Sequence, residues 1–520
     1  MPPSQLEAGF SLQEAIALHN GGELAKAKEL YTKLLHADPR NSDCLHLLGV
    51  IAAQKNDRQL AIDLIGEAIK LMPGNAVYFS NRGIVYCGLR EFDRALDDFA
   101  KAIEIDAECV DAYVYRGAAL SAINKNYLAL ESYDIALILN PNSAVAHSNR
   151  ANTLRGLGLH REAIVGYDKA IGLDPRFAEA YSNRGIALKE LGLLDDALTS
   201  YDKAISINPE SAEARSNRAT VLLLKGEMST GWEWYEWHRD KVLNAENRRE
   251  FGSPLWRGDQ ILEGKVVLLH SEQGYGDIIQ FCRYARMLAQ RGCGVIMEVP
   301  SALRKIFLHL EGVNQLIVRG EEIPAHDFHC PLMSLPRAFG TTLLSIPAQP
   351  QYLFPAEVDI REWSGILGPK RVPRIGLAWS GNPAHPNDKN RSIRIGRLLR
   401  HLPGGFEYHC LQTDGESLGR ALSIGAAATV KRHKCLSDFS QTAALSYLMD
   451  LVISVDTSVA HLSGALGRPT WLLLPFLPDW RWMMDRDDSP WYPSMKLFRQ
   501  KSAGDWETVL IRIRQALGAI

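Results

Sequence analysis

The first half of the sequence repeats itself every 34 residues, and this period restricts the possible folds more than any other feature. Small residues, bulky residues and prolines all recur in the same register: Ala27, Ala61, Ala95, Ala129, Ala163 and Ala197; Tyr31, Ile65, Phe99, Tyr133, Tyr167 and Tyr201; Pro39, Pro73, Pro141, Pro175 and Pro209, with Ala107 at the skipped position. Small residues let two helices cross closely, a bulky side chain fills the groove between them, and proline ends the second helix. The period therefore predicts stacked helix–turn–helix units, six of them complete between about residues 8 and 211.

A 34-residue helix–turn–helix register of this kind is that of the tetratricopeptide repeat (TPR). A seventh unit starts at Ala212 and runs into Trp232, Trp234, Tyr235 and Trp237, which we interpret as a cap that seals the last apolar face. The sequence thus predicts an α-solenoid, a TPR superhelix, over residues 8–241, followed by a linker over 242–263.

One position in the first helix of the repeats carries asparagine four times, at Asn81, Asn149, Asn183 and Asn217. A carboxamide both donates and accepts hydrogen bonds, so a row of them can pair with the backbone of an extended chain of any sequence. The row resembles the asparagine ladder of TPR-bearing O-GlcNAc transferases, which hold protein acceptors with it, although Leu47 and Tyr115 interrupt it here. The alternative is that Ser-Asn-Arg is a common filler of such helices. We expect a protein acceptor or partner in this groove.

Charge and composition exclude several classes of protein. Lys and Arg total 58 against 60 Asp and Glu, with no long basic run, so general nucleic-acid binding is not expected. The longest apolar runs, Leu451–Val455 and Trp471–Leu474, are too short to span a bilayer, so no transmembrane segment is expected. Residues 1–10 show no secretion signal, and the eight cysteines are scattered without a CxxC motif. We expect reduced thiols and a cytoplasmic location.

The second half loses the 34-residue register and alternates short apolar runs with amphipathic segments. The runs that read as strands are 265–270, 295–299, 315–318, 374–379, 408–412, 451–455 and 470–474. The segments that read as helices are 276–290, 301–310, 395–401, 439–448 and 459–466. Such alternation predicts parallel sheets, here in two Rossmann-like lobes over 264–360 and 371–520, the second ending in a helix near 505–517. The proline-rich stretch 347–373 between them is interpreted as a hinge.

Ligands of parallel sheets bind beyond the carboxyl ends of the strands, so the loops at strand exits are the candidate site. The first is Ser271–Asp277, where glycines permit a close backbone approach and Asp277 opens a helix. Asp277 is either a plain helix cap or a carboxylate that faces the cleft and takes a proton from an acceptor hydroxyl.

The second exit loop begins Trp379-Ser380-Gly381-Asn382 and continues through Lys389 and Arg391. Ser380, Gly381 and Asn382 can offer small polar groups to a phosphate, and Arg391 can supply positive charge for a departing diphosphate. For Lys389 a solvated surface role is the better interpretation. Gln412, at the end of the predicted strand 408–412, is assigned to the same side of the cleft.

The third exit loop carries Asp456, Thr457, Ser458 and His461 directly after the predicted strand 451–455. The first N–H groups of the following helix and its positive dipole end form an anion site, which two hydroxyls reinforce. His461 lies four residues after Thr457, on the same helical face, so both can address one ligand. Asp456 can hold sugar or ribose hydroxyls.

Two motifs together make the second half resemble the heptosyltransferase-like enzymes, glycosyltransferase family 9. They are Gly-Tyr-Gly-Asp at 274–277 and Asp-Thr-Ser-x-x-His at 456–461, followed by Leu-Gly-Arg-Pro at 466–469, within a similarity that covers about residues 264–510. The resemblance implies an inverting, metal-independent GT-B enzyme with Asp277 as the base and the nucleotide diphosphate held by the second and third loops. The first lobe is short for GT-B, and residues 387–392 lack the expected lysine–tryptophan pair. With the repeats, the chain resembles bacterial TPR–glycosyltransferase fusions.

An acidic motif and an aromatic loop in the second lobe each permit another interpretation. Asp485-Arg486-Asp487 matches the Asp-x-Asp of metal-dependent GT-A enzymes but lacks their context, so we expect no metal and no cofactor beyond a nucleotide-sugar co-substrate. The loop with Trp480, Arg481, Trp482, Trp491 and Tyr492 either stacks on a ligand or fastens the C-terminal helix across the lobes, and the second interpretation is preferred.

The sequence therefore predicts a glycosyltransferase that moves a sugar from a nucleotide-sugar donor to a hydroxyl of a protein recruited by the repeats. The alternatives are a TPR scaffold with an inactive transferase-like half, or an enzyme that modifies glycolipid or polysaccharide.

Overall fold

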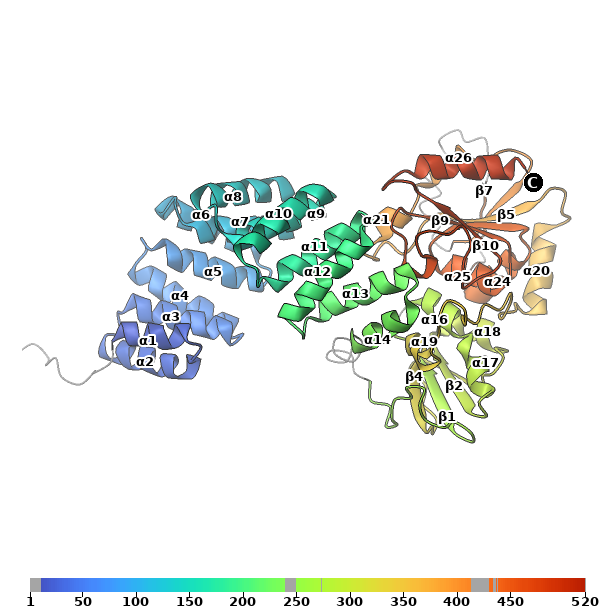
Figure 1. Ribbon diagram of the computed structural model, residues 1–520, viewed down its shortest axis with the longest axis horizontal. Helices are drawn as coiled ribbons and strands as arrows, with labels where there is room; N and C mark the ends of the chain where they lie inside the picture. Colours follow the sequence, from blue (N-terminus) through green and yellow to red (C-terminus); the bar gives the residue numbers. More distant parts are fainter. Residues whose placement is uncertain are drawn as a thin grey trace, which may run out of the picture. The chain divides into compact units, whose positions relative to one another are not determined.

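The computed structural model describes residues 11–238, 249–272, 274–412, 430–433, 436 and 438–519. Its internal contacts divide the chain into two compact units, Met1–Leu191 with Lys203–Pro209, and Gly192–Asp202 with Glu210–Ile520. Figure 1 shows the helices of the first unit and the two sheets of the second. The border between the units thus lies inside the repeat region, and the predicted linker 242–263 is described only from residue 249.

The repeat region consists of antiparallel helix pairs, as the period predicts. Their bounds are α1 Leu12–Asn20, α2 Leu24–Ala37, α3 Ser42–Gln54, α4 Arg58–Leu71, α5 Ala76–Gly88, α6 Phe92–Ile105, α7 Val110–Ala122, α8 Asn126–Leu139, α9 Ala144–Gly156, α10 His160–Leu173, α11 Ala178–Glu190 and α12 Leu194–Ile207. Helix α4 ends two residues before Pro73, and α6 ends at the equivalent place before Ala107. The helix end is therefore kept even in the repeat without proline.

The small residue of each first helix permits the close crossing. A Cβ atom added to Gly83 would lie 2.7 Å from the ring of Phe99, and one added to Gly117 would lie 2.7 Å from the ring of Tyr133. First helices of neighbouring repeats also contact each other, as α5 does α7 and α7 does α9. The first helices thus form one continuous layer of the first unit.

The last two repeat helices, α13 (Ala212–Lys225) and α14 (Met228–His238), belong to the second unit. Leu223, Leu224 and Trp232 are buried in the main core of the lobes. The indole of Trp232 donates a hydrogen bond to the carbonyl of Thr341 (3.2 Å), and its ring meets Trp480 edge to face at 5.1 Å. The seventh repeat is therefore built into the lobes and does more than seal the solenoid.

The first lobe contains a parallel sheet of four strands in the order β3-β2-β1-β4. The strands are β1 Val266–His270, β2 Gly294–Val299, β3 Gln315–Val318 and β4 Phe328–Pro331. Helices α16 Tyr275–Phe281 and α17 Tyr284–Ala289 replace the single helix expected over 276–290. The interruption coincides with the buried Arg283, whose Nε donates to the carbonyl of Gln280 (2.7 Å). The helix expected over 301–310 is shorter, with a 3-10 turn η2 Ser301–Leu303 and α18 Arg304–Phe307.

The second lobe contains a parallel sheet of six strands in the order β10-β9-β8-β5-β6-β7. The strands are β5 Arg374–Ala378, β6 Glu407–Cys410, β7 Val430–Lys431, β8 Leu451–Val455, β9 Thr470–Leu474 and β10 Met495–Arg499. Both sheets run from their first strand outward in two directions, the order of a doubly wound sheet, which binds ligands where that direction changes. The changes fall between β1 and β4 and between β5 and β8.

Helices cover both faces of the six-stranded sheet. Helices α22 Ile395–Leu399 and α26 Trp506–Leu517 pack on one face, and α24 Phe439–Tyr447 and α25 Ser458–Ala465 lie toward the other (Figure 1). The proline-rich stretch is not a plain hinge, since it contains α20 Glu357–Leu367. Pro355 and Pro369 flank this helix, and its Trp363 is buried and donates to Gln441 (2.8 Å). In the part of the chain that the structure describes, helices are too short or too polar to cross a bilayer.

Candidate functional site

The two lobes meet where the strand exits of both sheets face each other. Helix α16, which follows β1, contacts helix α25, which follows β8. A Cβ atom on Gly276 would lie only 2.8 Å from Cδ2 of His461, so glycine is required at this crossing. Asp277 and His461, predicted from separate loops, therefore lie at one interlobe contact.

Asp277 is bound on both carboxylate oxygens. Its Oδ2 accepts the N–H of Gly274 (3.1 Å) and caps α16, so the capping role considered for it is present. Its Oδ1 accepts a hydrogen bond from Arg481 of the other lobe. Burial raises the pKa of Asp277, the Arg481 guanidinium opposes this rise, and Asp479 adds to it. The carboxylate is thus held at the cleft in an environment that makes it more basic.

Arg481 lies in the 3-10 turn η4, Trp480–Trp482, which follows β9. Its neighbour Trp480 packs on Trp232, while Trp482 lies against His461 with ring centroids 5.3 Å apart. These tryptophans belong to the interlobe core, whereas α26 packs in a separate cluster. The expectation that this loop fastens the C-terminal helix is therefore wrong.

Sequence reasoning missed Arg481 and Asp479 as site residues. A signal for them exists, because Asp-Trp-Arg-Trp at 479–482 lies at the exit of a strand that was predicted correctly, the location where parallel sheets bind ligands.

The amino end of α25 supplies backbone donors. Thr457 is its N-cap residue, but the Thr457 side chain makes no capping hydrogen bond. Among the described residues, the N–H groups of Ser458 and Val459 have no partner, while those of Ala460 and His461 bond to the carbonyl of Thr457. Free N–H groups at a helix start, with the dipole behind them, favour an anion.

His461 is a buried, neutral imidazole. Burial lowers its pKa far below the ordinary value, and the positive charges of Arg481, Arg283 and Arg391 lower it further. Its Nδ1 lies 2.9 Å from the hydroxyl of Tyr492, and its Nε2 lies 3.9 Å from Oδ1 of Asp456. If Tyr492 donates to Nδ1, the ring proton is on Nε2, on the side of Asp456.

Asp456 has an unusual acidity. Burial and the neighbouring Asp479 raise its pKa to about 6, against an ordinary 3.8, while Arg391 and Arg481 act in the opposite direction. Arg391 and Asp479 also act on His385: partial burial and Arg391 lower the pKa of this imidazole, whereas Asp388, Asp479 and Asp277 raise it. The groups of the exit loops thus form one electrostatic cluster.

The loop after β5 uses most of its polar groups internally. The Gln412 side chain accepts the N–H groups of Trp379 (2.6 Å) and Ser380 (3.2 Å) and donates to the Ser380 hydroxyl (2.8 Å). The N–H of Gly381 bonds to the hydroxyl of Ser392 (2.9 Å), and Asn382 accepts the N–H of Ala384 (3.0 Å). The backbone N–H groups of Ser380 and Gly381 are therefore already paired inside the loop, so they shape the loop.

Arg391 is the charged group of this loop that reaches the cluster. Its Nε lies 3.3 Å from Asp388, and a Cβ atom on Gly381 would lie 2.5 Å from its Nη2. Arg391 influences the pKa of both Asp456 and His461. Lys389 is exposed, in keeping with the surface role expected for it.

The asparagine row is only partly free. Asn81, Asn149 and Asn183 lie in the first unit and Asn217 in the second, and all four are half-buried. The Asn81 amide nitrogen lies 2.7 Å from His46 Nε2, and burial lowers the pKa of His46 to about 4, so that ring is neutral. The side chains of Asn149, Asn183 and Asn217 have no hydrogen-bond partner among the described residues.

The other residues of the Ser-Asn-Arg triplets have structural tasks. Ser148 and Ser182 are buried, while Arg150 pairs with Asp134 (2.7 Å) and Arg184 with Asp168 (2.6 Å) of the preceding helix. In these two triplets only the asparagine amide is left for another molecule.

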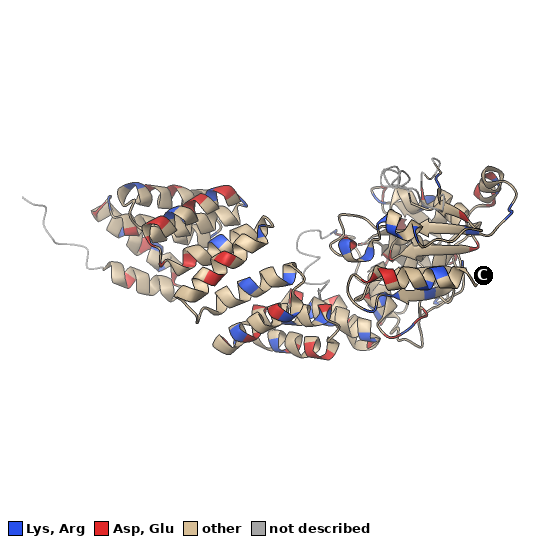
Figure 2. Ribbon diagram, turned by 90° about the horizontal axis from the view of Figure 1, so that it is seen from above, with Lys and Arg blue, Asp and Glu red and all other residues tan. Residues whose placement is uncertain are grey.

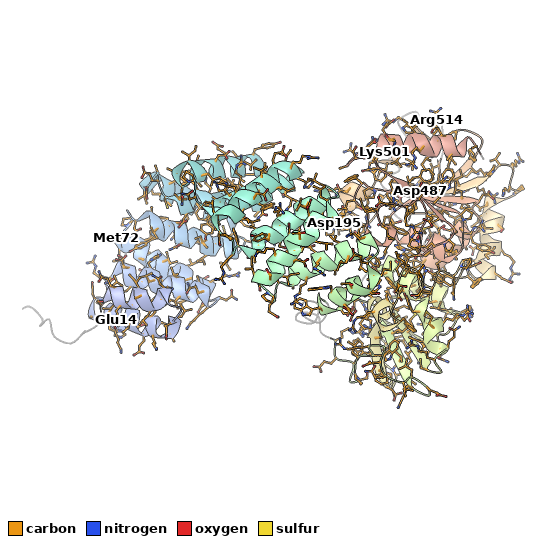
Figure 3. The ribbon with its side chains drawn as sticks, in the orientation of Figure 1. Glu14, Met72, Asp195, Asp487, Lys501 and Arg514 are labelled. Atoms are coloured by element: carbon orange, nitrogen blue, oxygen red, sulfur yellow. The ribbon has the colours of Figure 1, made fainter. Side chains whose placement is uncertain are left out.

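The repeats carry charges of both signs, and the acidic residues of the Asp485-Arg486-Asp487 motif are exposed. Lys and Arg are interspersed with Asp and Glu along the helices of the repeats (Figure 2). Asp487, labelled in Figure 3, is exposed, and Arg486 between the two acidic residues pairs with Asp488 (2.7 Å). Within the described ranges no three His, Cys, Asp or Glu side chains are grouped as metal ligands.

Comparison with protein families supports the repeats directly. Models of the tetratricopeptide repeat match residues 12–76 and 178–211, and a TPR repeat model matches 152–192. The N-terminal helices are therefore TPR repeats, and the interpretation of the 34-residue period is confirmed.

Similar proteins share mainly this part. Protein FlbA of Caulobacter vibrioides is 25% identical over 329 residues, which cover 57% of this chain and 54% of FlbA. The matched 57% of this chain is longer than the predicted repeat region, which ends at residue 241, so the similarity extends past the repeats. Small glutamine-rich tetratricopeptide repeat-containing protein 2 of Saccharomyces cerevisiae is 42% identical over 62 residues, 12% of this chain and 18% of its own length. The chain thus spans about half of FlbA and less of the yeast relative.

Among solved structures, YrrB, described as a TPR protein with an unusual peptide-binding site, is 25% identical, with a TM-score of 0.29. The match covers 35% of this chain and 95% of YrrB. MamA is 26% identical, with a TM-score of 0.28 and coverage of 33% and 94%.

Proposed function

We propose that this protein is an inverting, metal-independent glycosyltransferase of the GT-B type, which moves a sugar from a nucleotide-sugar donor to a hydroxyl of a protein bound by its TPR repeats. The observation that supports it most is the contact across the two lobes between helix α16, which carries Asp277, and helix α25, which carries His461.

The sheet topology fits this proposal. A GT-B enzyme has two doubly wound lobes with the site between them, and here both sheets change direction beside the loops that carry Asp277 and Asp456. Aromatic side chains are part of the core shared by the lobes, so we propose that the ligands bind at the polar groups beside it, Asp277, Arg391 and Asp456.

The donor diphosphate is proposed to bind at the start of α25. The unpaired N–H groups of Ser458 and Val459 face an anion, and Arg391 adds a full positive charge. His461 donates as a neutral imidazole, since its lowered pKa keeps it uncharged at physiological pH. Asp456 accepts sugar or ribose hydroxyls.

Asp277 is proposed as the base. As the acceptor oxygen forms its bond to the anomeric carbon, the bond from that carbon to the diphosphate breaks, and the hydroxyl proton passes to Asp277. Attack opposite the leaving group inverts the anomeric centre. The departing negative charge is stabilised by the α25 amides and Arg391, so the proposed step requires no metal.

Transfer can be tested with radiolabelled nucleotide sugars and cell protein as the acceptor source. We expect label in the protein fraction, and Asp277→Asn should reduce its incorporation by about 10²–10⁴-fold, because the amide cannot take the proton. Asp487→Asn, which changes an exposed carboxylate of the second lobe in the same way, is the control. Equal incorporation by wild type and Asp277→Asn would remove the proposed base.

The repeats supply the protein acceptor in this proposal, since TPR domains bind protein partners. Asn149→Ala with Asn183→Ala should lower label incorporation into protein without lowering hydrolysis of the donor. Asn142→Ala, an exposed amide between α8 and α9, should change neither. Label that appears in lipid or polysaccharide instead would favour the alternative of an enzyme that modifies glycolipid or polysaccharide.

The second candidate is a TPR scaffold with an inactive transferase-like half. The family matches favour it, because all of them fall within the repeats. A wild-type chain that binds no nucleotide and transfers no sugar would establish this alternative.

A further inference from the structure

The Arg481 side chain is bound on every side. Its Nη1 donates to Asp479 (2.8 Å), its Nε donates to Gln280 (2.7 Å), and its Nη2 donates to Asp277 and lies 3.7 Å from the sulfur of Met333. The guanidinium also lies 4.3 Å from the centre of the Trp480 ring. It is 7% exposed, so these contacts are made away from bulk water.

Two of these contacts hold α16 at points one turn apart. Asp277 and Gln280 are three residues apart, so they lie on the same face of the helix. A guanidinium has a rigid fork of donors, and binding both side chains fixes the rotation of α16 about its axis. The direction in which Asp277 points is therefore set from the other lobe.

The remaining surroundings of Asp277 act against its charge. Burial and Asp479 both favour the protonated carboxyl, while Arg481 is the cation that hydrogen-bonds to it. Each carboxylate oxygen already accepts one bond, from Arg481 or Gly274, and retains a second lone pair. The side chain is 20% exposed, so part of the carboxylate remains accessible.

We propose that Arg481 is a positioning residue of the transfer reaction: it holds the Asp277 carboxylate ionised and oriented toward the acceptor hydroxyl. This inference rests on the proposed function. It also assigns opposite roles to two neighbours in one turn, because Arg481 stabilises the charge of Asp277 and Asp479 disfavours it.

The first test compares pH profiles of Arg481→Gln, Arg481→Lys and Asp479→Asn in the full chain. Arg481→Gln should lower kcat about 10–100-fold through misplacement of the base. It should also move the acid limb of kcat/KM to higher pH, because the cation is lost. Asp479→Asn, which keeps the cap of η4, should move that limb to lower pH. Arg481→Lys should retain the wild-type limb while kcat falls, since a lysine cannot bind Asp277 and Gln280 together.

Calorimetry separates this role from donor binding. The affinity for the nucleoside diphosphate should stay within about threefold of wild type in Arg481→Gln. A loss of affinity equal to the loss of kcat/KM, with an unmoved acid limb, would overturn the proposal in favour of a donor contact.

A second measurement needs no enzyme activity. In Asp277→Cys, the rate of iodoacetamide alkylation at residue 277, followed by peptide mass spectrometry, reports the thiolate fraction. Adding Arg481→Gln should slow alkylation about tenfold at pH 7, as a one-unit rise in pKa requires. An unchanged rate would contradict the proposal even if transfer activity is found. A slowed rate in a chain that transfers no sugar would leave the Arg481–277 contact established and the proposed function refuted.

Discussion

Asp456 is a carboxyl group whose ionisation is unfavourable in the folded chain. Its pKa of about 6 lies above the ordinary value because burial and Asp479 disfavour ionisation. The folded chain therefore keeps this proton to higher pH than the unfolded chain does. Asp456 therefore lowers the free energy of unfolding progressively as the pH rises from its ordinary pKa of 3.8 to its folded-state pKa of about 6. Above that pH the loss of stability has its full value.

Asp456→Asn removes this titration. Relative to wild type, the variant should gain up to about 3 kcal/mol between pH 4 and pH 7, because a shift of about two units is worth that much. Thermal unfolding of both proteins at pH 4, 5, 6 and 7 measures the gain. A difference that stays constant over this range would show that Asp456 ionises normally.

Gly276 determines how closely the lobes approach. Gly276→Ala places a methyl group against the buried His461 ring, and we expect a loss of about 1–3 kcal/mol together with weaker nucleotide binding. Gly365→Ala is the control, since that helical glycine has open space around it and should be neutral or slightly stabilising. The unfolding temperatures of the two variants measure this difference in stability. Equal temperatures would refute the close contact between Gly276 and His461.

At the residue scale, the sequence indicated candidate site residues where they lie in a loop directly after a predicted strand. Asp277, Asp456 and His461 were proposed as site residues because each follows a recognisable strand, and the structure brings the elements that carry them into contact. Arg481 also follows a predicted strand, but its pairing with Asp277 could not be predicted, since the two residues are 204 positions apart. Pairing across lobes depends on their mutual packing, which no local pattern contains. The hydrogen bonds of Gln412 to the loop after β5 depend on the pairing of β5 with β6 inside the second lobe, which no local pattern contains either.

At the scale of elements, burial on both faces made the central strands predictable. The inner strands β8 and β9 have the predicted bounds, because continuous apolar runs mark buried parallel strands. The partly exposed edge strand β3 also has the predicted bounds. Strand β4 was missed because it is short and contains His329 and Pro331. Of the two edge strands, β7 has only two residues, and β10 contains Lys496 and Arg499, which interrupt its apolar run. Helix α20 was missed because its flanking prolines suggested a hinge.

Helix α14 belongs to the same unit as the lobes, and its Trp232 is buried in their core. Trp232→Ala should destabilise the second unit by about 3–5 kcal/mol, since a large buried ring is lost. Hydrogen exchange should accelerate in β1 and stay unchanged in α6, which lies in the first unit. Trp234→Ala, at a half-buried position of the same helix, is the control. Equal acceleration in α6 and β1 would contradict the division into two units.

At the scale of the whole molecule, the repeat period predicted half of the architecture, because one local pattern is copied along the chain. The extent of each compact unit was not predictable in this way. The last repeat obeys the 34-residue register, yet its Leu223, Leu224 and Trp232 complete the core of the lobes. A register shows where helices begin and end, whereas the partner of an apolar face is decided in three dimensions.

The central claim is that the cleft holds a nucleoside diphosphate at the start of α25. Titration calorimetry of the full chain with UDP, GDP and ADP tests it most directly, with CMP included for donors of the monophosphate type. We predict that one of them binds, and that Arg391→Gln weakens it about tenfold or more through loss of a charge-assisted bond, while Lys389→Gln in the same loop leaves it unchanged. Absence of binding by the wild type, or equal weakening by both variants, would contradict the account.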